Sequence, residues 1–293
     1  MINLNIFIKR KIHLIVNFFG YKILGAKKTV KHNDFDSIIK FIFNEIITEN
    51  KSERTPTIFD IGANDGQSIR RFKKIFNVCK ITSFEPTPIQ FNNIKERYKD
   101  DEDVSVYNYG ISNKEEILKF HSYEFSLINS FIPADNKSKL IKSRILSRKS
   151  NELNFENIIE VKTKSLDKFC LEKSIKTIDI LKIDTQGFED KVLNGCEDLL
   201  KEQKINIIEV ELILGFGYSK TLSFYDIEKY LRKYDYRLIS INNSGNVIST
   251  SNYVIDLLYV HQSSYEKIKE LHYKNKNIKD VTNKTNTNNP FTY

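Results

Sequence analysis

Cysteine is scarce and tryptophan is absent from this chain of 293 residues. The three cysteines, Cys79, Cys170 and Cys196, are odd in number and widely spaced, and none stands in a C-x-x-C or Cys/His cluster. This spacing predicts neither a structural zinc site nor a disulfide framework. The cysteine usage fits a reducing compartment, so we expect a cytoplasmic protein.

The sequence also lacks a long hydrophobic run. The uncharged stretch near the N-terminus, residues 12–21, is shorter than the about 20 apolar residues that a membrane span needs. No small-residue cleavage site of a signal peptide follows it. We therefore expect residues 1–30 to be a basic, apolar segment. It either packs on the domain as a helix or rests on an anionic membrane surface, which would make the protein peripheral at the inner membrane face.

Positive charge is in excess, with a formal net charge of +8. Lysines and arginines recur at residues 9–11, 27–28, 137–149 and in the C-terminal tail. This scatter favours a solvated surface and gives no firm nucleic-acid signal, although nucleic acid remains an alternative partner. Residues 274–293 are rich in Asn, Lys and Thr and have little to bury, so we expect a disordered tail.

The most informative stretch is T-I-F-D-I-G-A-N-D-G-Q at residues 57–67. A buried strand is predicted at its start, Gly62 and Gly66 bracket a turn, and apolar residues then recur at helical spacing. Glycine lets the backbone approach a ligand, and a helix start offers free N–H groups. The candidate ligand-binding residues are Asp60, Gly62, Asn64, Gly66 and Gln67; the simpler alternative is an ordinary strand–turn–helix capped by Asp65.

A second predicted strand ends in an acid that is followed by a proline. Glu85 lies about 20 residues beyond the glycine turn, the separation at which a carboxylate reaches ribose hydroxyls, and Pro86 fixes the backbone after it. The middle glycine of a dinucleotide fingerprint is missing, because Asn64 and Asp65 fill that region. This weakens a nicotinamide interpretation and suits S-adenosylmethionine, which has no pyrophosphate.

Three motifs together resemble the FkbM family of S-adenosylmethionine-dependent methyltransferases. They are D-I-G-A-N-x-G at 60–66, F-E-P at 84–86 and L-K-I-D-x-Q-G-x-E at 181–189, within a resemblance that covers roughly residues 55–215. The resemblance implies an α/β fold of the class I, Rossmann-like type: a doubly wound, mostly parallel seven-stranded sheet closed by an antiparallel hairpin. It also implies a methyltransferase domain over residues 31–273 and O-methylation, often of sugar hydroxyls in glycans.

A long insertion, about residues 112–164, separates the third and fourth predicted strands. Such insertions at the ligand face often cover a substrate. Because ligands lie beyond the carboxyl ends of the strands, we expect Asn108 and Gly110 near the adenine, although Gly110 is equally suited to a plain turn. Ser130 resembles the family's serine in this region, which implies that it faces the cofactor.

The chemical centre is predicted at the fourth strand, residues 178–184. Its period of two puts Lys182 and Asp184 on one face, Glu189 follows, and the next strand carries Glu211. Asp184 is the candidate base, with Glu211 or Glu189 orienting the acceptor hydroxyl. Two alternatives stay open: the three acids hold Mg²⁺ through oxygen ligands, or Asp184 and Glu189 only cap the following helix.

We therefore expect an O-methyltransferase that uses S-adenosylmethionine and accepts a sugar hydroxyl of a glycan or glycan precursor. A nucleic-acid methyltransferase is the first alternative. The basic charge supports it, but the N/D-P-P-aromatic motif of amino-methylating enzymes is absent, since the position reads D-T-Q-G at 184–187. The other alternative is a non-catalytic module that binds a membrane surface or a glycan. Acids at positions 184, 189 and 211 argue mildly against it.

Overall fold

The computed structural model describes residues 34–48, 54–135, 137–138, 141, 155–214, 217–220, 222–243 and 254–275. The chain divides into two compact units, residues 1–34 and 35–293, and the description below concerns the second. The predictions for residues 1–30, for most of the basic stretch 138–149 and for the tail beyond residue 275 lie outside these ranges. Within these ranges, no helix combines the length and the apolar character needed to cross a membrane.

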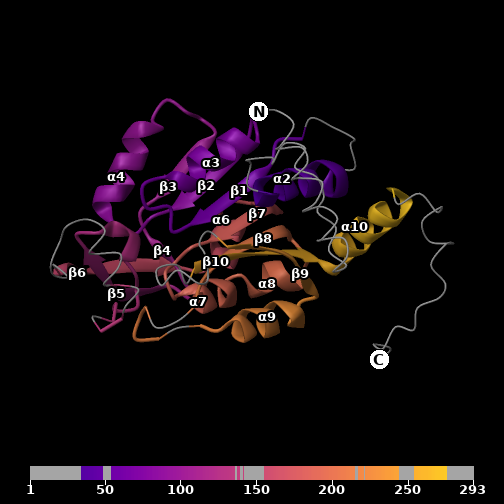
Figure 1. Cartoon of the computed structure of the whole chain (residues 1–293). Helices are drawn as coiled ribbons and strands as arrows, with labels where there is room; N and C mark the ends of the chain where they lie inside the picture. Colours follow the sequence, from indigo (N-terminus) through magenta and orange to yellow (C-terminus); the bar gives the residue numbers. More distant parts are fainter. Residues whose placement is uncertain are drawn as a thin grey trace, which may run out of the picture. The chain divides into compact units, whose positions relative to one another are not determined.

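A seven-stranded sheet forms the centre of the unit, with the strand order β3-β2-β1-β7-β8-β10-β9 (Figure 1). The five parallel strands are β1 (Thr57–Ile61), β2 (Lys80–Phe84), β3 (Val104–Tyr107), β7 (Ile178–Ile183) and β8 (Ile205–Ile213). The last two, β9 (Tyr236–Asn243) and β10 (Val254–His261), pair antiparallel, and β10 is antiparallel to β8. This topology confirms the doubly wound sheet with an antiparallel closing hairpin.

Helices cover both faces of the sheet (Figure 1). One face is covered by α2 (Asp34–Phe41), which continues as the π-helix η1 (Ile42–Ile47), by α3 (Gln67–Ile75), by α4 (Pro88–Arg97) and by α10 (Gln262–Asn275). The other face is covered by α6 (Leu166–Glu172), α7 (Glu189–Asn194), α8 (Glu197–Lys201) and α9 (Phe224–Lys233). The parallel strands are therefore mostly apolar on both sides, as is typical of strands between two helical layers.

Local sequence explains where the helices begin. The α3 helix buries Ile69, Phe72 and Ile75, which recur at helical spacing. The Ser165 side chain accepts a hydrogen bond from the Lys168 N–H and caps α6. A reciprocal capping box between Ser223 and Asp226 begins α9.

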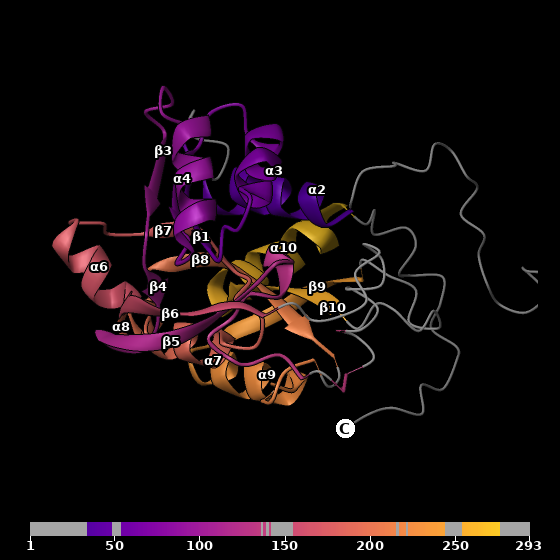
Figure 2. The same cartoon turned by 90° about the vertical axis from the view of Figure 1, so that its left-hand side faces the viewer.

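The insertion folds as a second, three-stranded sheet with the order β4-β6-β5 (Figure 2). Its strands are β4 (Gly110–Ile111), β5 (Glu116–Tyr123) and β6 (Phe155–Lys164), and the short 3₁₀ helix η2 (Ser126–Ile128) follows β5. The sequence analysis predicted an insertion here. It did not predict the pairing of β5 with β6, which joins residues far apart in the chain.

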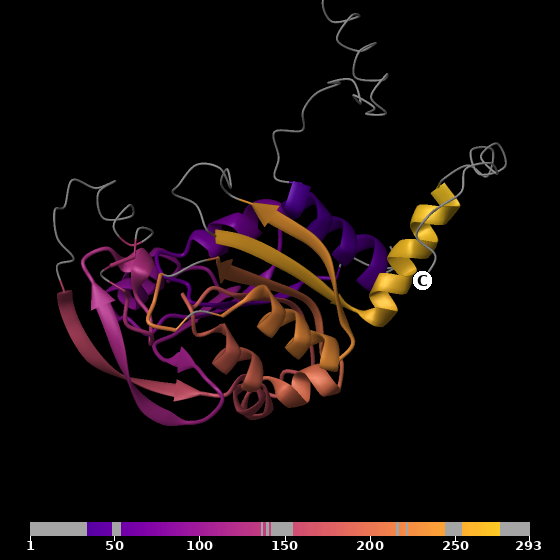
Figure 3. The same cartoon turned by 60° about the horizontal axis from the view of Figure 1, so that its bottom comes forward.

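The sequence analysis also missed α10. Tyr265, Ile268 and Leu271 recur at helical spacing and pack against the same apolar cluster as α2 and α3. The α10 helix therefore continues the domain to Asn275, past the predicted limit of residue 273. It lies at the opposite end of the unit from β5 and β6 (Figure 3).

Candidate active site

A cavity of about 370 Å³ opens at the carboxyl ends of the central strands. Ligands occupy this position in doubly wound folds. Its walls come from the turn after β1, the segments after β2 and β7, the strand β8 and the insertion. Among the lining residues are Gly62, Asn64, Gln67, Glu85, Pro86, Gly110, Phe120, Phe125, Phe131, Asp184, Gln186 and Glu211.

The turn after β1 passes directly against the end of β7. A side-chain carbon added at Gly62 would lie 2.0 Å from the backbone oxygen of Asp184, and the φ angle of Gly62 is +91°. Only glycine fits there. Gly66 also has a positive φ of 71°, but an added carbon would meet only ordinary contacts, and Gly66 does not line the cavity.

Glu85 is buried and joins two segments of the cavity wall. Its Oε2 accepts a hydrogen bond from the Asn64 N–H at 2.7 Å, and its Oε1 accepts from the Thr87 N–H at 2.8 Å and from the Thr87 hydroxyl. Burial raises the pKa of Glu85, and these hydrogen bonds oppose the rise. Each carboxylate oxygen has two lone pairs, so Glu85 retains capacity to accept from ribose hydroxyls.

Four of the predicted cofactor-binding residues lie away from the cavity surface: Asp60, Gly66, Asn108 and Ser130. The Asn108 amide donates to the carbonyls of Glu85 and Pro86, so it braces the segment after β2 from outside. The Ser130 hydroxyl donates to the Gln186 carbonyl at 2.9 Å and accepts from the Ile132 N–H. The structure thus gives Ser130 the role of anchoring the insertion to the segment after β7.

Asp60 lies beneath the cavity, on the face of the sheet covered by α3. Strand register makes it the neighbour of Lys182 on β7, and Lys182 is in turn the neighbour of Glu209 on β8. The side chain is fully buried, and neither of its oxygens accepts a hydrogen bond from any described residue. Burial raises the pKa of Asp60 to about 6. Asp60, a candidate ligand-binding residue in the sequence, therefore belongs to a buried row of charges and does not line the cavity.

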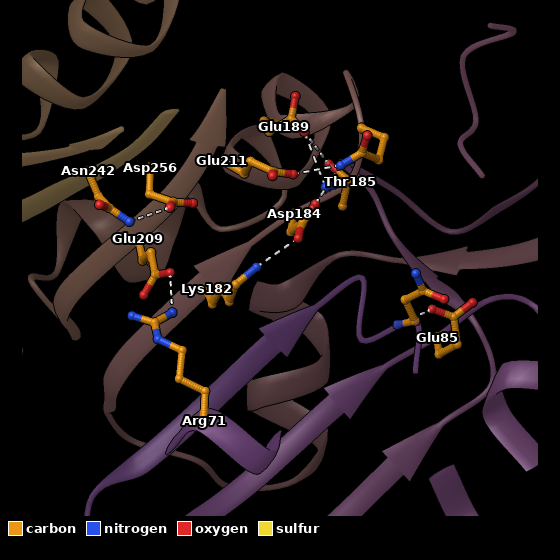
Figure 4. A network of polar contacts seen from close by, with 12 residues as sticks. Arg71, Glu85, Lys182, Asp184, Thr185, Glu189, Glu209, Glu211, Asn242 and Asp256 are labelled. Atoms are coloured by element: carbon orange, nitrogen blue, oxygen red, sulfur yellow. Dashed lines mark hydrogen bonds and ion pairs between the residues drawn. The ribbon is translucent and has the colours of Figure 1, made fainter. Parts of the chain in front are cut away.

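This row continues across the sheet (Figure 4). The Arg71 guanidinium of α3 donates to Glu209 at 2.6 Å and to Asp36 of α2 at 2.6 Å. On β10, Asp256 is opposite Glu211 and accepts from the Asn242 amide. Burial raises the pKa of Asp256 to about 6. The sequence analysis missed Arg71 and Asp256, because their proximity depends on helix packing and strand register.

Asp184 and Glu211 meet at the cavity wall through Gln186. The Lys182 ammonium donates to Asp184 Oδ2 at 2.9 Å. Gln186 Nε2 lies 2.8 Å from Asp184 Oδ1 and 2.6 Å from Glu211 Oε2. The Tyr218 hydroxyl donates to Gln186 Oε1 at 3.1 Å, which fixes the orientation of the amide. Gln186 was visible in the sequence motif without an assigned role, whereas nothing in the sequence pointed to Tyr218.

Glu189 serves the loop rather than the cavity. It is buried, and its Oε1 accepts from the N–H groups of Thr185 at 3.2 Å and Gly187 at 3.0 Å (Figure 4). Burial raises its pKa to about 7. Because Glu189 does not line the cavity, its geometry matches the alternative of a cap for the segment before α7, not an orienting group for the acceptor.

The acids do not form a ligand set for Mg²⁺. Within the part of the chain that the structure describes, no group of three or more His, Cys, Asp or Glu side chains could hold a metal ion. The oxygens of Asp184 face an ammonium and an amide N–H, and Glu189 faces backbone N–H groups. These donors occupy the positions that a cation would need, so the magnesium alternative does not fit these residues.

The family model of the Methyltransferase FkbM domain matches residues 60–238. The 2-O-methyltransferase NoeI of Sinorhizobium fredii is 27% identical over 154 residues, 51% of this chain and 60% of that protein. The chain thus spans less than two thirds of the length of this relative. Methyltransferase 1 of Beauveria bassiana is 26% identical over 197 residues, 64% of this chain and 76% of that protein.

Solved methyltransferase structures resemble the fold at low identity. An rRNA methylase from Streptococcus thermophilus matches with a TM-score of 0.43 and 8% identity, over 80% of this chain and 99% of that chain. The N-terminal domain of human METTL16 in complex with SAH gives 0.38 and 12%, over 85% and 78%. Because these TM-scores are below 0.5, the fold is assigned from the strand order of the sheet. With the family model covering more than half of the chain, the chain belongs to the FkbM family of S-adenosylmethionine-dependent methyltransferases.

Proposed function

We propose that this protein transfers the methyl group of S-adenosylmethionine to a hydroxyl of a sugar in a glycan or glycan precursor. The observation that carries the proposal is one cavity that combines the family's cofactor-side residues with two carboxylates and three phenylalanines. A 2-O-methyltransferase among the relatives agrees with oxygen as the acceptor atom.

On the cofactor side, Gly62 lets the turn after β1 lie close to the ligand, and Glu85 is placed to accept hydrogen bonds from the ribose. Bound S-adenosylmethionine supplies an electrophilic methyl group on a sulfonium. The protein contributes alignment, because the attacking oxygen must lie in line with the bond that breaks. The close approach of Gly62 to Asp184 brings the cofactor-side turn and the acid-bearing segment within one cavity.

On the acceptor side, Asp184 and Glu211 offer hydrogen-bond acceptors, and Phe120, Phe125 and Phe131 offer apolar ring surface. A sugar presents hydroxyl donors together with apolar C–H faces, so this mixture suits it. A nucleic-acid acceptor brings phosphates, which the two carboxylates repel. The composition of the cavity therefore favours the sugar over the nucleic acid.

Calorimetric titration tests the cofactor half of the proposal. We expect the purified protein to bind S-adenosylmethionine and not NADH, with no dependence on Mg²⁺. Glu85→Ala is expected to weaken this binding, and Glu96→Ala, an exposed acid of α4, serves as its control. Binding of NADH alone, or a strict requirement for Mg²⁺, would contradict the proposed site.

A further inference from the structure

Gln186 has an unusual backbone for its type. Its φ angle is +55°, a left-handed conformation that strains a non-glycine residue. In this conformation the amide nitrogen of the Gln186 side chain lies within hydrogen-bond distance of both Asp184 and Glu211. Backbone strain of this kind persists where surrounding contacts hold the residue in place. Here the strained backbone positions the Gln186 amide between Asp184 and Glu211.

The two acids that share this donor have different surroundings. Asp184 lies 2.9 Å from the Lys182 ammonium. Burial alone would raise the pKa of Asp184, but the Lys182 charge holds it below its ordinary value. The ammonium therefore favours the ionised form of Asp184, which makes Asp184 a weaker proton acceptor than a carboxylate without a paired cation.

Glu211 faces more negative than positive charge. Asp184, which follows β7, and Asp256 on the antiparallel neighbour β10 face it, and Glu209 shares its side of β8, with Lys182 as the nearby cation. Burial and the charge of Asp184 raise the pKa of Glu211 well above its ordinary value. Glu211 lines the cavity, so a bound hydroxyl can reach it.

We propose that Glu211 is the proton acceptor in methyl transfer and that Gln186 is the positioning residue that holds it beside Asp184. The inference rests on the proposed O-methylation and replaces the sequence-based choice of Asp184 as the base. The acceptor oxygen bonds to the methyl carbon while the sulfur–carbon bond breaks and its electron pair stays on sulfur. The hydroxyl proton passes to ionised Glu211, which becomes a neutral carboxylic acid and later releases the proton to solvent.

Infrared titration of the carboxyl groups tests this assignment without an acceptor. The C=O band of protonated carboxyls is followed against pH in the wild type, Glu211→Gln and Asp184→Asn. We expect the wild-type minus Glu211→Gln difference to show one carboxyl that keeps its proton above the ordinary glutamate range. In Asp184→Asn this band should remain, but loss of the Asp184 charge should lower the pH at which the Glu211 carboxyl titrates. A Glu211 carboxyl that titrates at the ordinary value overturns the proposal.

Gln186→Met tests the positioning role. Losing the donor removes stabilisation of ionised Glu211, so its titration and the acid limb of the pH–rate profile should both move to higher pH. Gln203→Met is the matched control, because Gln203 has the same φ of +55° and lies exposed in the loop before β8. Equal effects of the two substitutions would overturn the positioning role.

Activity provides the last readout. Glu211→Gln should lower the methyl-transfer rate on a sugar acceptor by about 100-fold or more while calorimetry shows S-adenosylmethionine binding retained. A wild-type protein that methylates no sugar contradicts the proposed function, whereas the infrared titration still decides the Glu211 assignment. Near-normal turnover by Glu211→Gln overturns the assignment of Glu211 as the proton acceptor.

Discussion

Lys182 is a buried ammonium that lies among several carboxylates of the central sheet. It pairs with Asp184, and strand register places it between Asp60 and Glu209. A buried charge is costly unless it is paired, so each member of this row depends on the others. At the scale of single residues, Lys182 is the group that keeps Asp184 ionised.

Lys182→Met should therefore destabilise the fold strongly. Removing the ammonium leaves the fully buried Asp60 and the partly exposed Asp184 without their cation, which costs about 3–5 kcal/mol. Urea unfolding measures the change. The control is Lys204→Met, since Lys204 pairs with Glu202 at an exposed site and should change the unfolding free energy far less. Equal losses for both variants would contradict the importance of the buried row.

The raised pKa of Asp60 predicts that the stability of the fold depends on pH. Its pKa is about 6 in the fold against an ordinary value of 3.8, so the native state binds the proton more tightly than the unfolded chain. The unfolding free energy therefore falls as pH rises from about 4 to about 6, by an amount on the order of 3 kcal/mol. Asp60→Asn should be more stable than the wild type at pH 8 and equal to it near pH 4.

Denaturant unfolding at both pH values checks this prediction. Asp100→Asn, at an exposed position after α4, is the control and should leave the pH profile of stability unchanged. An Asp60→Asn variant that is less stable than the wild type at pH 8 would show that the ionised carboxylate stabilises the fold.

At the scale of elements, the meeting of the β1 turn with the end of β7 shapes the cavity. Gly62→Ala and Gly66→Ala both place a side chain at positive φ, but only the first meets a backbone oxygen at 2.0 Å. Gly62→Ala should therefore abolish S-adenosylmethionine binding, whereas Gly66→Ala should cost only about 1–2 kcal/mol of stability. Calorimetry and urea unfolding separate these outcomes, and equal loss of binding would contradict the close approach at Gly62.

The opposite ends of the same strands are held by Asp179 of β7. Its buried carboxylate accepts from Arg54 at 2.5 Å, from the Thr57 N–H of β1 at 2.9 Å and from Asn206 of β8 at 2.9 Å. Asp179→Ala leaves these donors unpaired and should cost about 3 kcal/mol or more in urea unfolding. Because the cavity lies at the other end of the strands, the folded variant should bind S-adenosylmethionine as the wild type does.

At the scale of the whole molecule, the sequence predicted what local patterns control. Each central strand is a short, largely apolar run that could be predicted from its residues, and the family resemblance implied that these strands form a seven-stranded sheet with a closing hairpin. Capping by Ser165 was equally local. The pairing of β5 with β6 and the packing of α10 could not be predicted, because they depend on contacts between distant parts of the chain.

The same limit applies to the candidate site. The motif order predicted that Gly62, Glu85 and Asp184 gather at one edge of the sheet, where they line one cavity. It placed Lys182 and Asp184 on one face, but it could not predict that Gln186 also donates to Asp184, nor that Asp60 is buried beneath the cavity. The positions of these charged side chains depend on strand register and side-chain geometry, and the spacing of the motifs determines neither.

The most direct test of the account is transfer of an isotopically labelled methyl group from S-adenosylmethionine to a panel of glycans and RNAs, with the product identified by mass spectrometry. The account predicts label on a sugar hydroxyl oxygen as a base-stable ether, with none on RNA. Label on a nucleobase, or no transfer to any glycan by a protein that binds S-adenosylmethionine normally, would contradict it.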